Sequence, residues 1–327
     1  MTSSGWDFLQ DALDIDIRDE VQRASRRQID ARSSMSRMVD LALERGYANS
    51  VGDLIDQAAN LRQHKLFNAL LTALQRPHAD YLLPAHEWEE RWLRRILPNE
   101  HPIVLLVPFA PVGFYFDVSQ TEETHRSRTL PARFQNPYKM DYVQDAGSAL
   151  AALRGRILLD GVRVSEGPLG NRFAGHIRRA RGGMQEVPVR VGRQMVIEKR
   201  PVRFEVTLNR NYSVTEMLAT LAHEIGHLYC GHLGAAKSDW WPDRTELDEP
   251  TREYEAESVA RLVFRRIAPG AELPDHLEQY FAPGAPVPDA GWGRVVSASD
   301  RIIDHCLTSI DETAATLRLQ GNLQAEE

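Results

Sequence analysis

The clearest periodic pattern in the chain lies between Ser213 and Leu228. Apolar residues recur there at helical spacing, namely Met217, Leu218, Leu221, Ala222, Ile225 and Leu228. Ser213 and Glu216 stand three positions apart before this stripe, the spacing of a capping box that begins a helix. Gly231 and Gly234 follow as stop signals. The pattern therefore predicts an amphipathic helix that starts after Ser213 and ends near these glycines.

Two further elements flank this helix. Apolar residues alternate with polar ones from Val202 to Leu208, which predicts a half-buried strand. Pro250 suits the first turn of a second helix, because the run from Thr251 to Arg266 contains no other proline or glycine. A strand followed by two helices is thus expected in this part of the chain.

The remaining elements are predicted from the same patterns. Helices are expected over 17–46, 51–74, 86–96 and 146–153, and a Ser299-capped helix is expected to reach about Leu319, before a polar tail. Strands are expected over 102–107 and 113–118, and a Gly182–Gly183 pair suggests a hairpin before the strand at Val202. These elements predict an α+β fold with two domains, 1–130 and 141–327, and a proline-bearing linker at 131–140.

Composition narrows the class of protein. The chain has 327 residues, 43% of them hydrophobic, and a net charge of −7, so it can bury a core and is not basic overall. No run approaches 18 consecutive apolar residues, and the polar N-terminus lacks the layout of a signal peptide. The two cysteines make no disulfide framework. We therefore expect a cytoplasmic protein without a membrane partner.

Residues 223–227 read His-Glu-Ile-Gly-His and fall inside the predicted helix. Two histidines four positions apart lie on one helix face, so the imidazoles of His223 and His227 can reach a single metal ion. Glu224 stands beside them, where a carboxylate can take a proton from water. This motif predicts a metal site whose third protein ligand comes from another element.

The carboxylates of the second helix are the candidates for that third ligand. Glu253 and Glu257 share a helix face, whereas Glu255 points about 200° away from Glu253 and is the fallback ligand. His232 comes nine residues after His223, about 180° round the helix, and is expected to face away from the metal. Cys230 is near the ligand face, where it either approaches the metal or packs as a buried thiol.

Two surface features add candidate partner sites. Nine basic residues gather between 172 and 203, namely Arg172, Arg178, Arg179, Arg181, Arg190, Arg193, Lys199, Arg200 and Arg203. Arg178, Arg179 and Arg181 are candidates for contact with phosphates or an acidic partner, and the alternative is a sheet edge protected by charge. Trp240 and Trp241 follow in a polar loop, where they cap a cleft, dock a partner or pack on the core.

The stretch from Val202 to Leu262, with LAHEIGHLYCGH and REYEAESVA, resembles the ImmA/IrrE type of zincin metallopeptidase. Its Glu-x-x-Ala-acid spacing is similar to the second motif of gluzincin peptidases. This resemblance implies that Glu253 is the third zinc ligand, that Glu257 orients a ligand histidine, and that Ala256 lets the two helices approach. It also implies that the strand at 202–208 is a sheet edge that pairs with an extended substrate.

The front half resembles the N-terminal domain of ArdC-like antirestriction proteins. The matching residues are Phe67–Leu71, Gln75–Pro77, Trp88, Pro102–Ile103 and Phe116–Thr121. One departure concerns the turn before the Pro102–Ile103 strand, which is usually basic in those domains. This chain has Asn99-Glu100-His101 instead, which argues against nucleic-acid contact through that turn.

The two resemblances imply two functions. The first is zinc-dependent hydrolysis of a peptide bond in a cytoplasmic protein, with helix-turn-helix repressors as the substrate class. His223, His227 and Glu253 would hold Zn²⁺ and Glu224 would act as general base. Candidates for stabilising the oxyanion are Tyr212, Tyr229, Tyr254 and His305. The alternative is an antirestriction-type protein that binds single-stranded DNA and whose metal is mainly structural.

Overall fold

The computed structural model describes residues 35–44, 46, 48–107, 110–131, 134, 145–170, 173–191, 194–272, 281 and 288–307. The chain forms two compact units, Met1–Val143 with Asp275–Ser297, and Gln144–Pro274 with Ala298–Glu327. The first unit thus includes residues 275–297, which the sequence analysis assigns to the second domain. Both units combine helices with small sheets, which confirms the α+β class. Residues 17–34, most of the linker at 131–140 and the tail lie outside the described residues.

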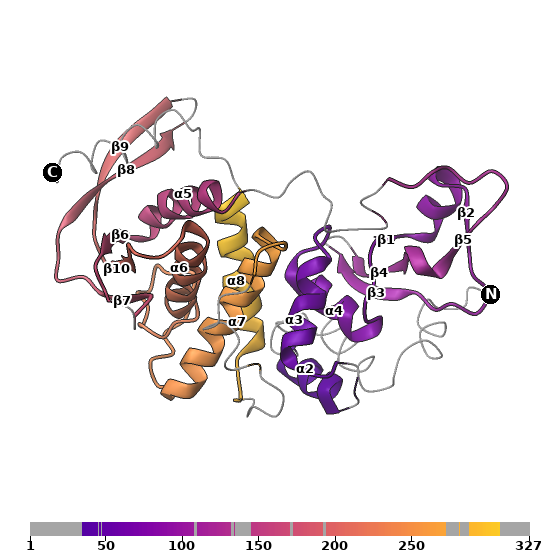
Figure 1. The fold of residues 1–327 in the computed structure, drawn as a ribbon, viewed down its shortest axis with the longest axis horizontal. Helices are drawn as coiled ribbons and strands as arrows, with labels where there is room; N and C mark the ends of the chain where they lie inside the picture. The colour runs from indigo at the N-terminus through magenta and orange to yellow at the C-terminus, as the bar shows by residue number, and fades with distance from the viewer. Residues whose placement is uncertain are drawn as a thin grey trace. The chain divides into compact units, whose positions relative to one another are not determined.

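The described part of the first unit starts with three helices and continues into short strands (Figure 1). The helices are α2 Met35–Glu44, α3 Val51–Asn60 and α4 Leu66–Gln75; the strands are β1 Leu82–Leu83, β2 Arg94–Ile96, β3 Ile103–Val107, β4 Ala110–Asp117 and β5 Thr121–Glu123. They form an antiparallel sheet in the order β1-β4-β3 and a separate β2–β5 pair. The helix expected over 86–96 is wrong: a π-helical turn at Glu87–Arg91 ends before Leu93, whose φ of 53° breaks the helix.

Residues that carry the ArdC-like resemblance build the core of this unit. The Asn68 amide donates to the Leu106 carbonyl and accepts from its N–H, and the Gln75 amide does the same with Val104. Helix α4 thereby satisfies backbone groups of β3 as a neighbouring strand would. Trp88 is fully buried and donates its indole N–H to the Phe116 carbonyl. These side chains therefore stabilise the fold of the first unit.

The second unit places a small sheet on one side of two helices (Figure 1). Its elements are α5 Ala146–Ile157, β6 Val162–Gly167, β7 Gly175–Arg179, β8 Met184–Val191, β9 Gln194–Pro201, β10 Phe204–Asn209, α6 Val214–Tyr229 and α7 Glu249–Ile267. Helix α6 packs against α5, α7 and the strands β7 and β10. Helix α8, Trp292–Leu307, crosses the division between the units at residue 297.

The position of the strand at 202–208 differs from the expectation. The sheet order is β6-β10-β7, with β10 parallel to β6 and antiparallel to β7, so β10 lies in the middle and β7 lies at an edge. The expected edge strand at 202–208 is therefore wrong. Alternating apolar residues report one buried sheet face, and this pattern is the same in a central strand and an edge strand.

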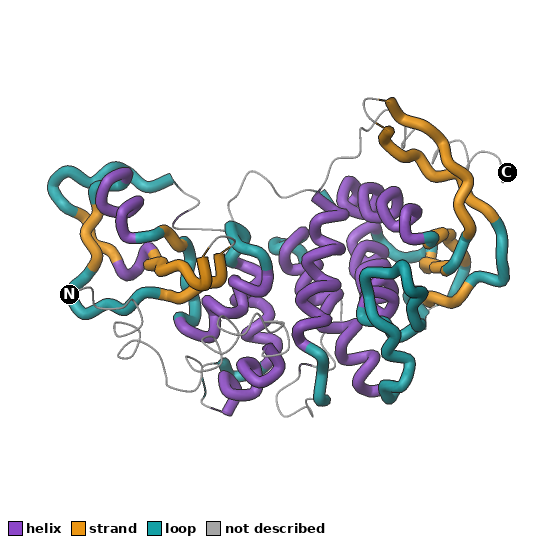
Figure 2. Tube along the Cα trace, turned by 180° about the vertical axis from the view of Figure 1, so that it is seen from behind, coloured by secondary structure: helices purple, strands orange, loops and turns teal. Residues whose placement is uncertain are grey.

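Three other features complete the unit. Strands β8 and β9 form a hairpin before β10, as expected, and it extends from the sheet as a two-stranded ribbon (Figure 2). The Gly182–Gly183 pair lies before β8 and not in the turn of this hairpin. The Ser299-capped helix is wrong, because α8 begins at Trp292 and Ser299 is buried within it. Among the described residues, no helix combines the length and the apolar character needed to cross a membrane.

Candidate metal centre

Helix α6 carries the His-Glu-x-x-His motif and has clear boundaries. The Ser213 hydroxyl accepts from the Glu216 N–H and the Glu216 carboxylate accepts from the Ser213 N–H, which confirms the capping box. The helix ends at Tyr229, and Gly231 then adopts a φ of +89°. A Cβ at Gly231 would lie 2.2 Å from the Pro242 carbonyl oxygen, so only glycine fits this turn.

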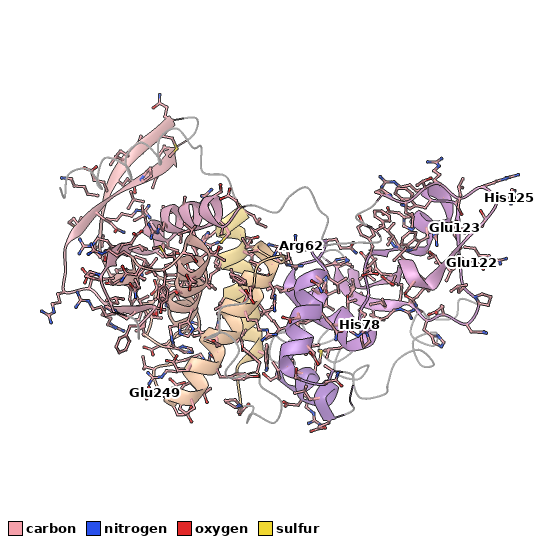
Figure 3. All side chains as sticks on the ribbon, in the orientation of Figure 1. Arg62, His78, Glu122, Glu123, His125 and Glu249 are labelled. Atoms are coloured by element: carbon pink, nitrogen blue, oxygen red, sulfur yellow. The ribbon has the colours of Figure 1, made fainter. Side chains whose placement is uncertain are left out.

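Helix α7 brings carboxylates to the same place. The Asp248 side chain caps it by accepting from the Thr251 N–H, and Pro250 lies in the first turn as predicted. A Cβ at Gly226 would lie 3.3 Å from Ala256 Cα, so the two helices cross at a pair of small residues. Glu249 lies exposed at the start of α7 (Figure 3), whereas Glu253, one turn later, faces α6.

Three donor atoms converge between these helices. His223 Nε2 and His227 Nε2 are 3.1 Å apart, and each lies 3.4 Å from a carboxylate oxygen of Glu253. Tetrahedral zinc with ligands at about 2.0–2.1 Å requires donors about 3.3 Å from one another. The distances to Glu253 end on different oxygens, Oε2 for His223 and Oε1 for His227, and each separation is close to this value, so the three side chains fit a zinc-sized ion.

A buried carboxylate orients the first histidine. Glu257 is 2% exposed, and its Oε2 lies 3.0 Å from His223 Nδ1. A carboxylate accepts the Nδ1 proton, which leaves Nε2 of His223 as the atom that faces Glu253 and the metal position. The role that the gluzincin resemblance implies for Glu257 thus agrees with its position.

Charge is unevenly divided over the histidine pair. Burial lowers the pKa of His223, but hydrogen bonds to Glu253 and Glu257 outweigh it and raise this pKa to about 10. At His227 burial dominates over the bond to Glu253, and the pKa falls to about 4. Hydrogen bonds from the two histidines hold the pKa of Glu253 well below its usual range. Near neutral pH and without metal, His223 therefore carries a positive charge and His227 is neutral.

Glu224 is a buried carboxylate beside this cluster. Burial raises the pKa of its carboxyl to about 7, the charge of His223 opposes that rise, and Glu253 adds to it. The Ile177 backbone N–H of β7 donates to the Glu224 carboxylate. Glu224 is thus held between the metal position and a sheet edge, with a pKa close to neutral pH.

The edge strand β7 presents backbone groups beside Glu224. Ala180 N–H donates to Arg203 O and Asn209 N–H donates to Ala174 O, which fixes the residues of β7 that bond to β10. Hydrogen-bonded pairs alternate along an antiparallel ladder, so the backbone groups of Gly175, Ile177 and Arg179 point away from β10. These groups form the sheet edge next to Glu224.

His232 does not face away from the histidine pair, as the sequence analysis expects. Its Nδ1 lies 3.0 Å from His227 Nδ1, because the helix ends at Tyr229 and the turn at Gly231 carries the chain back. The angular argument assumed that the helix continues to His232. Glu255 is not a ligand of the first cluster: it is fully buried, lies 3.0 Å from His232 Nε2 and forms a bidentate ion pair with Arg244.

A second group of metal-type side chains results from this turn. Cys230, His232 and Glu255 are all buried and offer donor atoms within 4.8 Å of one another. Arg244, however, occupies both oxygens of Glu255 at 2.6 and 2.7 Å. A guanidinium at the carboxylate opposes cation binding. Arg244 would therefore compete with any cation for the Glu255 carboxylate. Of the two alternatives for Cys230, its burial agrees with a packed thiol, and it forms no disulfide.

The proposed surface arginines are partly engaged within the protein. Arg178 pairs with Glu205, and Arg179 donates two hydrogen bonds to the Leu233 carbonyl. Arg181 is exposed on the turn between β7 and β8. The arginines of β7 thus hold the sheet and the loop after α6, which leaves Arg181 as the most accessible cation of the three.

The tryptophan pair packs on the far end of α6. Trp241 is buried, and Trp240 is 38% exposed. Both rings lie against Tyr229, at centroid distances of 5.4 and 4.8 Å. The Tyr229 hydroxyl donates to Asp160 and lies 3.3 Å from His305 Nε2, so neither of these two oxyanion candidates is directed at the metal position.

Sequence reasoning missed three contributors to the site. Gly231 marks the end of the helix but not the direction of the chain that follows, so His232 could not be placed from it. Arg244 has no distinguishing spacing, and the Ile177 N–H is a backbone group without any sequence signal. Comparison with models of protein families, with curated proteins and with solved structures finds no match to this chain.

Proposed function

We propose that this protein is a zinc-dependent endopeptidase that hydrolyses a peptide bond in a cytoplasmic protein. The observation that carries the proposal is the convergence of His223 Nε2, His227 Nε2 and Glu253, with a buried glutamate, Glu224, beside them. Two imidazoles and one carboxylate are the protein ligands of catalytic zinc sites that keep one position open.

When bound, zinc supplies Lewis acidity, which polarises a carbonyl and makes water acidic enough to lose a proton near neutral pH. Glu224 takes this proton and returns it to the leaving amine, a role that suits its pKa of about 7. Ile177 holds the Glu224 carboxylate at the sheet edge, because its N–H donates to it. The outward backbone groups of β7 would align an extended substrate by adding a strand to the sheet.

The substrate class follows from resemblance. ImmA/IrrE-type peptidases cut helix-turn-helix repressors, so a purified repressor of this kind is the substrate to test first. An extended segment of the repressor must reach β7, since backbone pairing needs a strand-like conformation. Cleavage is therefore expected in a loop or linker rather than within a packed helix.

Nucleic-acid binding receives less support as a second function. Arg178 and Arg179 are engaged by Glu205 and Leu233, so the patch expected to contact phosphates is partly neutralised. If single-stranded DNA binds here, its affinity should fall steeply with salt and weaken in Arg181→Ala. Binding that is absent, or that does not depend on salt, would exclude this alternative.

The test of the proposal joins metal content to catalysis. Wild-type protein should hold about one zinc per chain. Glu224→Gln should keep the zinc and lose cleavage, while Glu249→Gln, at an exposed position of α7, should keep both. A wild-type protein that holds no zinc, and binds none when zinc is supplied, would refute the peptidase proposal.

A further inference from the structure

A chain of side chains leads from the second metal-ligand histidine into the interior of the unit. His227 Nδ1 lies 3.0 Å from His232 Nδ1, and His232 Nε2 lies 3.0 Å from Glu255 Oε2. Arg244 contacts both oxygens of Glu255 and also donates to the Cys230 carbonyl at 3.2 Å. His232 is 4% exposed and Glu255 is fully buried, so water does not replace these contacts.

The protons of this chain can be assigned from its inner end. A bidentate guanidinium favours the ionised carboxylate, which can only accept hydrogen bonds. Glu255 therefore accepts the proton of His232 Nε2. In the neutral imidazole, the other nitrogen of His232, Nδ1, then carries a lone pair.

The lone pair on His232 fixes the state of His227. Two nitrogens 3.0 Å apart with one lone pair between them require one proton, so His227 Nδ1 is the donor. In the neutral imidazole, the other nitrogen of His227, Nε2, then carries the lone pair, and it faces Glu253 and His223. A metal ion binds an imidazole through a nitrogen lone pair, so His227 Nε2 is in the state that coordination requires.

We propose that His232, anchored by Glu255 and Arg244, is a positioning residue that fixes His227 in its metal-binding tautomer. It does for His227 what Glu257 does for His223, with one difference. Glu257 places a carboxylate directly on Nδ1, whereas the second histidine is reached through a neutral imidazole. This inference rests on the proposed metal centre for its purpose but not for its proton assignment.

The first measurement needs no metal. In full-length protein with chelator, long-range ¹H–¹⁵N spectra of the imidazoles should show His227 protonated at Nδ1 and His232 protonated at Nε2. Selective His→Gln variants at the other positions assign the signals. A proton on His227 Nε2 alone would overturn the proposal.

The second measurement is zinc affinity by chelator competition. His232→Leu removes both nitrogens at similar volume and should weaken zinc binding about 10- to 100-fold. His232→Gln, whose amide can accept from His227 and donate to Glu255, should recover part of that loss. His101→Leu, an exposed position in the first unit, should change nothing.

A spectroscopic signature separates positioning from loss of fold. With Co²⁺ in place of zinc, the visible bands should shift in His232→Leu and return towards wild type in His232→Gln. Equal zinc affinity and equal bands in wild type and His232→Leu would overturn the proposal while the metal centre stands. Absence of metal binding in wild type, with the expected imidazole protons, would overturn the peptidase function and leave the tautomer assignment supported.

Discussion

Two groups of potential metal ligands lie side by side on the same pair of helices. His223, His227 and Glu253 form one group; Cys230, His232 and Glu255 form the other, near the C-terminal end of α6. Both bring donor atoms within 4.8 Å of one another. In the first, the donor atoms face one another and are partly accessible, whereas in the second every side chain is buried.

The two groups differ in the charged residue that contacts a donor side chain. Glu257 contacts His223 at Nδ1, which leaves Nε2 directed at the metal position. Arg244 stands behind Glu255 and supplies a cation where a metal would need to bind. The two groups thus resemble each other in the proximity of their donors and differ in whether a cation already contacts the carboxylate. His232 of the second group also contacts the ligand His227 of the first.

The strongest test of this contrast is metal content. Glu253→Ala should lose its zinc, because two histidines alone leave the ion with too few protein ligands. Cys230→Ala should keep about one zinc per chain. Elemental analysis after gel filtration measures both. Loss of zinc from Cys230→Ala would move the metal to the second group and reverse the comparison.

Removing the cation of the second group should destabilise the protein. Arg244→Ala leaves the carboxylate of Glu255 buried without its partner, a change that costs about 3–5 kcal/mol. Denaturant unfolding of the metal-free protein reports the loss. Arg178→Ala removes an arginine whose side chain is 56% exposed, and it should cost less than about 1 kcal/mol. Equal losses in the two variants would show that the buried ion pair of Arg244 with Glu255 contributes no more to the free energy of unfolding than an exposed pair.

The turn that separates the two groups should tolerate no side chain. Gly231→Ala combines a positive φ with a Cβ only 2.2 Å from the Pro242 carbonyl oxygen. The backbone strain alone costs about 1–3 kcal/mol, and the clash adds to it, so we expect the free energy of unfolding to fall by more than that. Gly170→Ala has a φ of +70° but open space around the new methyl group, and it should cost less. Thermal unfolding of both variants isolates the clash from the backbone conformation.

Zinc binding should release protons from the first group only. The raised pKa of His223 means that metal-free protein holds a proton there at pH 7.5, above the ordinary histidine value. Zinc needs that nitrogen, so about one proton should leave on binding, and apparent affinity should rise with pH until His223 titrates. Calorimetry in buffers of different ionisation enthalpy counts the proton. Zinc binding without proton release would contradict the assigned charge of His223.

The raised pKa of His223 also makes the free energy of unfolding of the metal-free protein depend on pH. A raised histidine pKa contributes stability below pH 6.5, and this contribution is lost as pH rises through about 10.

Much of the first group was predictable from local patterns. Ser213 and Glu216 predicted where α6 begins, and the spacing of His223 and His227 predicted a shared face. These features depend on one helix and need no knowledge of its neighbours. The choice of Glu253 came from resemblance to a gluzincin motif, since the residues alone left Glu255 as a fallback.

The second group was not predictable because it depends on a reversal and on a distant partner. Gly231 was recognised as a stop, but a stop signal does not tell the direction of the chain that follows. His232 therefore could not be placed. The middle position of β10 was missed for a similar reason, since neighbours in a sheet are set by β6 and β7, and the alternation within β10 does not report them.

The closeness in sequence of the two groups has a consequence for folding. All their side chains, and Arg244, lie between His223 and Glu257, so the loop that must close is short and its entropic cost is low. Contacts that are local in sequence form early, and pairings between distant segments form late. His223 and Glu257 are 34 positions apart, whereas Arg163 of β6 and Glu205 of β10 are 42 apart, so we expect α6 and α7 to acquire zinc before β6 joins the sheet. The N–H of Ile177 would reach Glu224 last, so metal capture would precede catalytic competence.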